Sequence, residues 1–431
     1  MRVLAFLFLV TGPCVASDLH VEGRPGDDAA VVAWVNEHLT ELTAMYEALH
    51  AAPEPSFEER ETAASVARAL GAAGYQVTSG VGKTGVVGVL ANGTGRTIMI
   101  RGDLDALPVT EATGLSYASH RSGVMHACGH DVHTTALIGT ARALVALRDR
   151  WHGTVVVVAQ PAEEIGQGAR AMIADGLFTR FPKPEVALAL HVAADLAEGN
   201  VGWTAGWWAA NVDSVDVTIH GRGAHGARPQ DGVDPIVASA QIVTAWQTLV
   251  SRRMDPTEDG VVTVGSIHGG TKGNVIPDDV AMQLTVRSFT DEVRRQLLDG
   301  IGQIATDTCR AFGCPSPPTI VVKDEYTPAA WNDPALAAAA ARLFRGVLGD
   351  DHVVERRREM IGEDFGIYAR TLGVPGFLFR VGTVSADAVA ASQRRGGAPL
   401  PSLHSGTFAP IPASTLRTAV RAMTNLVLSL R

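Results

Sequence analysis

The hydrophobic pattern of the first half of the chain predicts alternating strands and helices. Short, mostly β-branched runs at 97–100, 155–158 and 186–190 are typical of strands buried in a parallel sheet. Apolar residues at helical spacing flank these runs, which favours an α/β domain with a central, mostly parallel sheet covered by helices. The helices are predicted at 31–50, 57–75, 134–147 and 167–177, and the strands at 76–77, 86–90, 97–100, 154–160 and 186–191.

The pattern changes after residue 211. Residues 212–219 alternate between apolar and polar side chains, as a half-exposed strand does. The order strand, helix, strand, strand, helix, strand over about 110 residues is that of a ferredoxin-like α+β module. We interpret 212–324 as an inserted domain that divides a larger domain into residues 18–211 and 325–431. Its strands are predicted at 212–219, 261–267, 280–287 and 319–323, and its helices at 234–251 and 291–312.

Beyond the predicted insertion, the helix and strand alternation resumes. It runs through 336–348, 365–372 and 376–381 and closes with a helix at 413–430. The stretch 386–401 is rich in Gly, Ala, Ser and Arg, which is typical of a mobile surface loop.

The first 17 residues predict a secretory signal peptide. Arg2 is followed by an apolar run at 3–10 and by small residues up to Ser17, so cleavage is expected after Ala16 or Ser17. Pro13 disfavours a lipoprotein signal centred on Cys14. The apolar run is too short to span a bilayer, and no later run is long enough. We therefore predict a soluble, exported protein, periplasmic or secreted.

Composition and charge exclude several classes of function. The 431 residues are 46% hydrophobic and 19% charged, as in globular enzymes, and the net charge is −9. Because no basic stripe is present, we expect no nucleic-acid partner and no binding to anionic membranes.

Cysteine usage singles out one thiol. Of four cysteines, Cys14 leaves with the predicted signal, and Cys128, Cys309 and Cys314 remain. An odd number of thiols in an oxidising compartment implies that at least one has another role. Cys309 and Cys314 could pair at a helix end. Cys128 would then stand alone between histidines, where a metal ion could hold it as a thiolate.

Metal-binding side chains follow three of the predicted strands. Cys128 and His130 come after the first in a glycine-containing turn, Glu163 and Glu164 follow the second, and His191 ends the third. Ligands collect beyond the carboxyl ends of strands in open α/β sheets, and this mixture of thiolate, imidazole and carboxylate suits a metal site.

The two adjacent carboxylates are expected to have different roles. Neighbouring residues on an extended chain point in opposite directions, so one of Glu163 and Glu164 can bind metal while the other accepts a proton from water. A solvated start to the next helix is the alternative. His404 is a further single candidate, and His133, one helical turn from His130, is expected to support the ligands from behind.

These motifs resemble the hippurate hydrolase group. That group contains N-acyl-amino-acid and indoleacetyl-amino-acid amidohydrolases, within the larger set of di-metal aminoacylases and carboxypeptidases. The resemblance covers nearly the whole mature chain in the same order. The matching motifs are Arg101-Gly102-Asp103-Leu104-Asp105-Ala106-Leu107-Pro108, Cys128-Gly129-His130-Asp131, Glu163-Glu164, Gly223-Ala224-His225 with Pro229, Gly273-Asn274-Val275-Ile276-Pro277, and Glu363-Asp364-Phe365.

The resemblance implies a site with two divalent ions, which could be zinc, manganese, cobalt or nickel. It assigns Glu163 as the general base and Asp105 as a residue behind the ligands, and Asp103 occupies a position that is a histidine ligand in distant carboxypeptidases. One departure is Ser405-Gly406 after the last ligand, where many relatives have Asn-Pro. The implied ligands are Cys128, His130, Glu164, His191 and His404.

The insertion is expected to contribute substrate contacts. The resemblance implies that His225 reaches an active site, often that of a partner subunit, and stabilises an oxyanion. Asn274 and Arg287 are candidates for gripping a substrate carboxylate, which arginine can bind bidentately. The resemblance also implies homodimerisation through the insertion. Residues 221–226 fit GxGxxG formally, but Pro229 disturbs the helix start and 240–246 contain no acid, which argues against a dinucleotide.

The expected activity is metal-dependent hydrolysis of the amide bond of an N-acyl amino acid, with a small-molecule substrate such as hippurate. A dipeptidase or carboxypeptidase with the same metals is the nearest alternative. A non-catalytic periplasmic binding protein on the same fold is the alternative from another class, although the base and all five candidate ligands are present.

Overall fold

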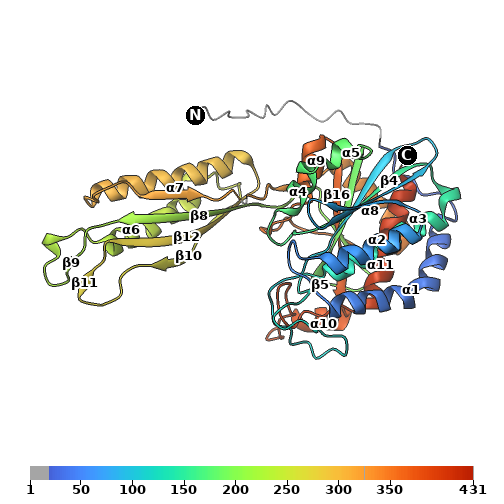
Figure 1. The fold of residues 1–431 in the computed structure, drawn as a ribbon, viewed down its shortest axis with the longest axis horizontal. Helices are drawn as coiled ribbons and strands as arrows, with labels where there is room; N and C mark the ends of the chain where they lie inside the picture. The colour runs from blue at the N-terminus through green and yellow to red at the C-terminus, as the bar shows by residue number, and fades with distance from the viewer. Residues whose placement is uncertain (1–18, 325, 431) are drawn as a thin grey trace.

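The computed structural model describes residues 19–324 and 326–430. These residues form two lobes joined by a narrow neck (Figure 1). We call residues 211–322 the small lobe and the remainder the large lobe. The predicted signal peptide, residues 1–17, lies outside the described residues. Within the described ranges, no helix combines the length and apolar character needed to cross a bilayer.

The large lobe is built on an eight-stranded sheet in the order β1-β2-β4-β3-β5-β16-β6-β15. The four central strands β4, β3, β5 and β16 are parallel, and β1 and β2 extend them antiparallel. This arrangement confirms the predicted α/β class with a mostly parallel centre. The strands are β1 (Gln76–Val81), β2 (Gly85–Asn92), β3 (Thr97–Asp103), β4 (Gly153–Gln160), β5 (Val186–Ala197), β6 (Val201–Trp203), β15 (Val353–Glu355) and β16 (Gly376–Val384).

Helices cover both faces of this sheet because its strands are apolar on both sides. In β4, Val155 and Val157 belong to one hydrophobic cluster and Val156 and Val158 to the other. One face packs against α1 (Asp27–Ala51), α2 (Arg60–Ala72), α3 (His130–Ala146), α8 (Pro334–Leu348) and α11 (Pro412–Ser429), and the other against α4 (Gly168–Ala174), α5 (Leu177–Arg180) and α9 (Gly366–Leu372). Burying each such side chain stabilises the fold by about 1.5–3 kcal/mol.

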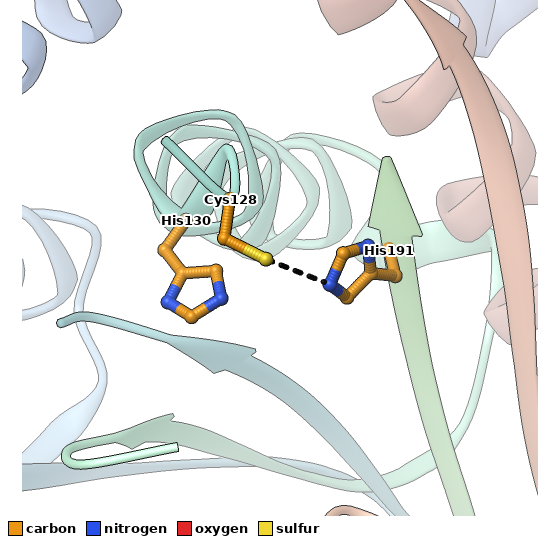
Figure 2. A group of neighbouring side chains, drawn as sticks. All are labelled: Cys128, His130 and His191. Atoms are coloured by element: carbon orange, nitrogen blue, oxygen red, sulfur yellow. Dashed lines mark hydrogen bonds between the residues drawn. The ribbon is translucent and has the colours of Figure 1, made fainter. Parts of the chain in front are cut away.

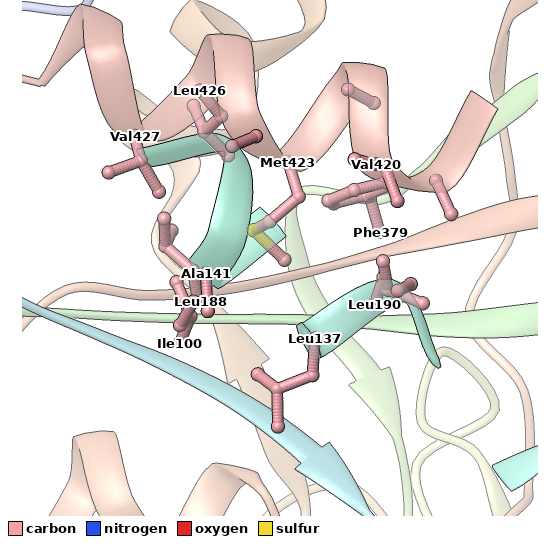
Figure 3. Packing of buried hydrophobic residues seen from close by; sticks show 14 of the residues in the cluster. Ile100, Leu137, Ala141, Leu188, Leu190, Phe379, Val420, Met423, Leu426 and Val427 are labelled. Atoms are coloured by element: carbon pink, nitrogen blue, oxygen red, sulfur yellow. The ribbon is translucent and has the colours of Figure 1, made fainter. Parts of the chain in front are cut away.

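The largest cluster lies between α3, α11 and the central strands (Figure 3). Leu137 of α3 and Met423 of α11 pack toward Ile100, Leu188 and Phe379 on three neighbouring strands. This packing fixes the start of α3 against the sheet, and the start of α3 carries His130.

The small lobe is a four-stranded antiparallel sheet in the order β10-β12-β8-β13. Its two helices have polar caps, since Asp234 accepts from two backbone N–H groups of α6 and Thr290 accepts from Val293 N of α7. Trp246 is buried in its core. The elements are β8 (Asn211–His220), β9 (Ala224–His225), α6 (Pro235–Thr248), β10 (Gly260–His268), β11 (Val275–Ile276), β12 (Asp279–Ser288), α7 (Asp291–Ala311) and β13 (Thr319–Val322).

The neck consists of two chain segments held side by side. β7 (Gly206–Ala209) pairs with β14 (Ala330–Asn332), and Val212 and Thr327 exchange two backbone hydrogen bonds of 2.8 and 3.1 Å. The Asn211 side-chain oxygen accepts from Tyr326 Oη and Ala329 N, both at 2.8 Å. The small lobe therefore leaves and rejoins the large lobe at one point.

The structure differs from the predicted elements in several places. The first helix after the Cys128-His130 turn begins at His130 rather than near 134, and β5 continues to Ala197 because it pairs with β16. The predicted loop at 386–401 contains a helix, α10 (Ala386–Ser392), whose first turn is capped by Ser385. Cys309 and Cys314 are both free thiols in the described chain.

Candidate metal centre

The centre lies along the carboxyl-terminal side of β3, β4 and β5, which are neighbours in the sheet. Glu163 and Glu164 follow β4 after a short turn. His191, predicted at the end of its strand, instead lies within β5, since pairing with β16 extends the strand beyond it. Strand adjacency therefore brings together residues that are far apart in the sequence.

The turn between Cys128 and His130 depends on Gly129. Its φ of 79° lies in the left-handed region, and a Cβ at this position would stand 2.6 Å from Val192 Cγ2. Ala127 in the same turn accepts a hydrogen bond from His404 N at 2.8 Å. This contact draws the late loop carrying His404 onto the turn.

The candidate ligand atoms lie close to one another. Cys128 Sγ and His191 Nε2 are 3.6 Å apart, and His130 completes a group whose ligand atoms lie within 4.8 Å of one another (Figure 2). Glu164 extends the cluster, because its two oxygens lie 3.7 Å from His130 Nε2 and 3.5 Å from His404 Nε2. The structure thus brings together all five side chains expected as ligands.

Hydrogen bonds orient two of the imidazoles for coordination. His130 Nδ1 lies 2.8 Å from the carbonyl oxygen of Asp105, and His191 Nδ1 lies 2.7 Å from that of Val192. Each Nδ1–H therefore donates to a carbonyl and leaves Nε2 with a lone pair directed at the cluster.

These residues fit divalent metal ions. His130 Nε2 and Glu164 Oε1 are buried and have no hydrogen-bond partner within the described residues, which leaves two good ligand atoms unsatisfied. Burial and the nearby Glu164 carboxylate raise the pKa of the Cys128 thiol. A divalent cation would stabilise the thiolate and complete the coordination of both orphaned atoms.

His133 supports the centre but is not itself available as a ligand. Its Nδ1–H donates to Asp103 at 2.6 Å, and its Nε2 accepts from Val192 N at 2.9 Å. Both ring nitrogens are therefore occupied. The second contact fixes the backbone immediately after His191, which is the supporting position expected from the sequence.

Asp105 orients the carboxylate pair. Its Oδ1 accepts from Glu163 N and its Oδ2 from Glu164 N, each at 3.1 Å, while its own carbonyl oxygen holds His130. One residue therefore connects two of the segments that supply ligands.

Asp103 is committed to a buried ion-pair network. One of its oxygens accepts from His133 and the other from the Arg101 guanidinium at 2.6 Å. Arg101 is buried and also pairs with Glu363 at 2.9 Å and Asp364 at 3.1 Å. Both carboxylate oxygens of Asp103 therefore accept hydrogen bonds from neighbouring side chains.

Glu163 stands between the metal cluster and this network. Its carboxylate lies 3.9 Å from His130 Nε2 and shares a group with Glu363 and Asp364 whose oxygens are within 4.8 Å of one another. Burial, Glu363 and Glu164 raise the pKa of the Glu163 carboxyl. A carboxylate with a raised pKa takes up a proton more readily at neutral pH, as a general base must.

A pocket of about 960 Å³ opens over the centre and has walls on both lobes. Arg287 reaches it from β12, and its Nη1 is buried without a partner within residues 19–324 and 326–430. The remaining wall is largely apolar. Its apolar residues are Phe57, Ile165, Val212, Met360, Ile361 and Leu403.

Two of the predicted site residues are not brought to this pocket. His225 and Asn274 are exposed and belong to the β9–β11 ribbon at the far end of the small lobe (Figure 1). Ala227 N donates to His225 Nδ1 at 3.0 Å, which leaves Nε2 as the ring nitrogen that carries the proton. Within one chain, neither side chain can reach the metal cluster.

Sequence reasoning missed the residues that surround the carboxylates. Glu363 was part of a matching motif but had no assigned role, and residues 57–59 were placed in the predicted helix 57–75, whereas α2 begins only at Arg60. The buried Glu59 and the pocket residue Phe57 both belong to this segment. A cluster of acids beside prolines at a helix junction was the available signal.

Comparisons with a family model, with curated proteins and with solved structures all point to the same family of hydrolases. Residues 99–395 match the model of peptidase family M20/M25/M40. The chain is 39% identical to N-acetyl-L-cysteine deacetylase of Bacillus subtilis, over 78% of each protein, and 36% identical to hippurate hydrolase of Campylobacter jejuni, over 74% of this chain and 82% of that protein. The crystal structure of a dinuclear metal-binding M20 peptidase of B. subtilis superposes with a TM-score of 0.75 and 30% identity, covering 91% of this chain and 98% of that one.

Proposed function

The chain belongs to peptidase family M20/M25/M40, and from this premise we propose that it hydrolyses the amide bond of N-acyl amino acids to a carboxylic acid and a free amino acid. Hippurate-like compounds, in which an aromatic acid acylates glycine, are the proposed substrates. The proposal is narrower than the family, which also contains peptidases.

One observation carries the proposal. A general-base candidate, Glu163, and five ligand candidates line or adjoin a pocket whose other wall holds the unpartnered Arg287 guanidinium. A site for water activation thus faces a cation suited to a substrate carboxylate. In an N-acyl amino acid, a single carbon separates the free carboxylate from the scissile amide nitrogen. Such a substrate therefore offers an amide to the candidate metal centre and a carboxylate to Arg287.

Cys128, His130, Glu164, His191 and His404 would hold the divalent ions. When bound, these ions would supply Lewis acidity to polarise the amide carbonyl and lower the pKa of the attacking water. Glu163 accepts a proton from that water molecule while the water oxygen attacks the carbonyl carbon. Glu163 then delivers the proton to the amide nitrogen, and the amine leaves.

Arg287 orients the substrate by pairing with its carboxylate, and the apolar wall receives the acyl group. Burial and the neighbouring Glu363 carboxylate keep the proton affinity of Glu163 high, and Glu363 is itself paired with Arg101. Water exclusion from this buried side of the pocket strengthens the interactions that develop during the reaction.

The proposal includes a homodimer. His225 and Asn274 lie too far along the small lobe to act within their own chain, so the partner subunit's His225 is proposed to donate from Nε2–H to the developing oxyanion. The small lobe, corresponding to the predicted domain 212–324, would then act as both lid and dimerisation element. Export after removal of residues 1–17 is also part of the proposal.

A substrate panel tests this function. Purified protein loaded with Zn²⁺, Mn²⁺, Co²⁺ or Ni²⁺ is assayed for amine release from hippurate, N-acetyl amino acids and dipeptides, with and without a chelator. Chelator-sensitive cleavage of acyl amino acids is expected. Preference for dipeptides would instead support the peptidase alternative, and binding without turnover would support a non-catalytic binding protein.

A further inference from the structure

Strained backbone is concentrated around the proposed site. Four non-glycine residues in the described chain have φ in the left-handed region: Phe57 at 62°, Lys83 at 80°, Ala162 at 51° and His404 at 65°. Residues other than glycine rarely adopt this backbone conformation, and it persists only where the surrounding structure enforces it. His404 is a candidate ligand. The other three lie around a single buried carboxylate, that of Glu59.

Glu59 binds the strained segments directly. Its side chain is fully buried, and Oε1 accepts from Phe57 N at 2.9 Å and from Ala162 N at 2.8 Å. Its Oε2 accepts from Thr84 Oγ1 at 2.5 Å, one residue after Lys83. Three donors therefore satisfy a buried carboxylate that would otherwise be costly to bury.

Both residues held by Oε1 adjoin functional groups. Ala162 immediately precedes Glu163 and Glu164, so its φ sets the direction in which the carboxylate pair leaves β4. Phe57 lines the substrate pocket, and Lys83 Nζ lies 3.6 Å from the centroid of its ring. One carboxyl oxygen thus connects the pocket wall to the backbone that carries the base.

A second contact from the same segment supports this connection. Ser56 Oγ donates to Asp105 Oδ2 at 2.6 Å, and Asp105 accepts the backbone N–H groups of Glu163 and Glu164. The segment 56–59 therefore supports the carboxylate pair in two ways. Ser56 holds Asp105, which accepts from the N–H groups of Glu163 and Glu164, and Glu59 holds Ala162, the residue before them.

We propose that Glu59 is a positioning residue that holds Ala162 in the left-handed conformation, and thereby aims Glu163 and Glu164, while it fixes Phe57 against the substrate. This inference rests on the proposed function only in taking Glu163 as the base and Glu164 as a ligand. Glu59 itself touches neither substrate nor metal.

The proposal predicts which substitutions are tolerated. Glu59→Gln keeps an Oε1 that can accept both backbone N–H groups, and the Thr84 hydroxyl can turn to accept from the new amide. Glu59→Met has similar length but no acceptor. Without that acceptor, Ala162 should leave the left-handed region, which disfavours a non-glycine residue by roughly 5- to 30-fold.

Substitution of the strained residue gives the sharpest test. Glycine adopts positive φ without the steric penalty, so Ala162→Gly should restore the geometry when Glu59 can no longer enforce it. Wild type, Glu59→Gln, Glu59→Met, Glu59→Asp and the double variant Glu59→Met/Ala162→Gly are compared, with Thr84→Val as a control that removes only the Oε2 contact. Glu59→Asp provides a second test if Glu59→Met does not fold. It keeps a buried acid, but its carboxylate oxygens lie one methylene farther from Phe57 N and Ala162 N.

Two readouts are needed. The first is kcat and KM for whichever amide the wild type cleaves, and the second is Co²⁺ affinity measured by competition with a chelator. Thermal unfolding establishes that each variant is folded. Co²⁺ affinity reports on the placement of Glu164 without any substrate, so failure of the proposed function is distinguishable from failure of this inference.

We expect Glu59→Met and Glu59→Asp to lower kcat by about 5- to 30-fold and to weaken Co²⁺ binding. Glu59→Gln should stay within about threefold of wild type, and the double variant should recover most of the lost kcat. Folded Glu59→Met or Glu59→Asp protein with wild-type kcat and Co²⁺ affinity would overturn the proposal. A double variant no better than Glu59→Met would overturn it as well.

Discussion

The role of Arg287 is testable by pairing a protein variant with a substrate variant. Arg287→Met keeps the length of the side chain and its packing on β12 but removes the guanidinium that lines the pocket. Hippurate and hippuramide differ only in whether the glycine end carries a charge. If Arg287 binds the substrate carboxylate, the substitution should penalise hippurate and leave hippuramide nearly unaffected.

The magnitude follows from the surroundings of Arg287. Its Nη1 is buried without a partner in the described chain, and burial lowers the pKa of the guanidinium. Asp213 is close enough to oppose this effect, but its carboxylate is already paired with Arg294 at 2.6 Å. A hydrogen bond to a charged group contributes about 1.5–3 kcal/mol, which is a factor of roughly 10 to 150 in kcat/KM for hippurate.

Initial rates at several substrate concentrations give kcat/KM for both substrates with both proteins. Arg287→Lys should recover only part of the loss, since lysine lacks the planar fork. Arg295→Met, an exposed charge on α7, controls for the change in net charge. An equal loss for hippurate and hippuramide would refute the assignment, because it would place the effect of Arg287 in the structure of the pocket.

Three further predictions concern the centre and its support. Glu163→Gln should lower kcat by about 10²- to 10⁴-fold, measured with the best substrate, while elemental analysis finds unchanged metal content. Cys128→Ala removes one of the five candidate ligands and should lower the bound metal per chain after dialysis against a weak chelator. Burial alone lowers the pKa of His50, but hydrogen bonds to Asp131 and Glu111 raise it to about 9. The stability that His50 contributes should therefore be complete below about pH 6.5 and be lost as the pH rises through 9, and urea unfolding of His50→Gln should show a flatter dependence over that range.

The opposite outcomes are informative for each residue. Full turnover by the Glu163 variant would exclude it as the base. Unchanged metal content in the Cys128 variant would remove the thiol from the ligand set. A pH dependence of unfolding that survives His50→Gln would assign that dependence to other groups.

The sequence predicted the fold because its strands are buried on both faces. The β-branched run 155–158 can be satisfied only by apolar layers on both sides, and the structure supplies both. Short strands near one edge of the sheet, such as β6 and β15, were not predicted, since three residues carry too little pattern. The helix α10 in a Gly- and Arg-rich stretch was also missed. Its capping residue, Ser385, lies just before the stretch that was interpreted as a loop.

The sequence predicted which segments converge better than it predicted their local geometry. Cys128, Glu164 and His191 were chosen as candidate ligands because each follows or ends an apolar run, and the structure places them close together. The sequence could not show that β5 continues past His191, because that extension depends on pairing with β16, almost 200 residues away. Glu59 was invisible for a similar reason, since its importance comes from the φ of Ala162, and no local pattern encodes that value.

The division into lobes places the proposed base and candidate ligands on one side of the pocket and the proposed carboxylate-binding residue, Arg287, on the other. The ligand candidates and Glu163 belong to the large lobe, whose sheet and helices fix them, whereas Arg287 approaches across the pocket from a lobe attached at one neck. Besides the neck, contacts between the lobes include the ion pairs Arg370–Asp291 and Arg358–Asp259 and the packing of the Arg358 guanidinium over the Phe289 ring. Exposed ion pairs of this kind contribute at most about 1 kcal/mol each. A rotation of the small lobe about the neck would move Arg287 relative to the centre without disturbing any candidate ligand. If Arg287 binds the substrate carboxylate as proposed, the position of the small lobe would set the distance between that carboxylate and the candidate ligands.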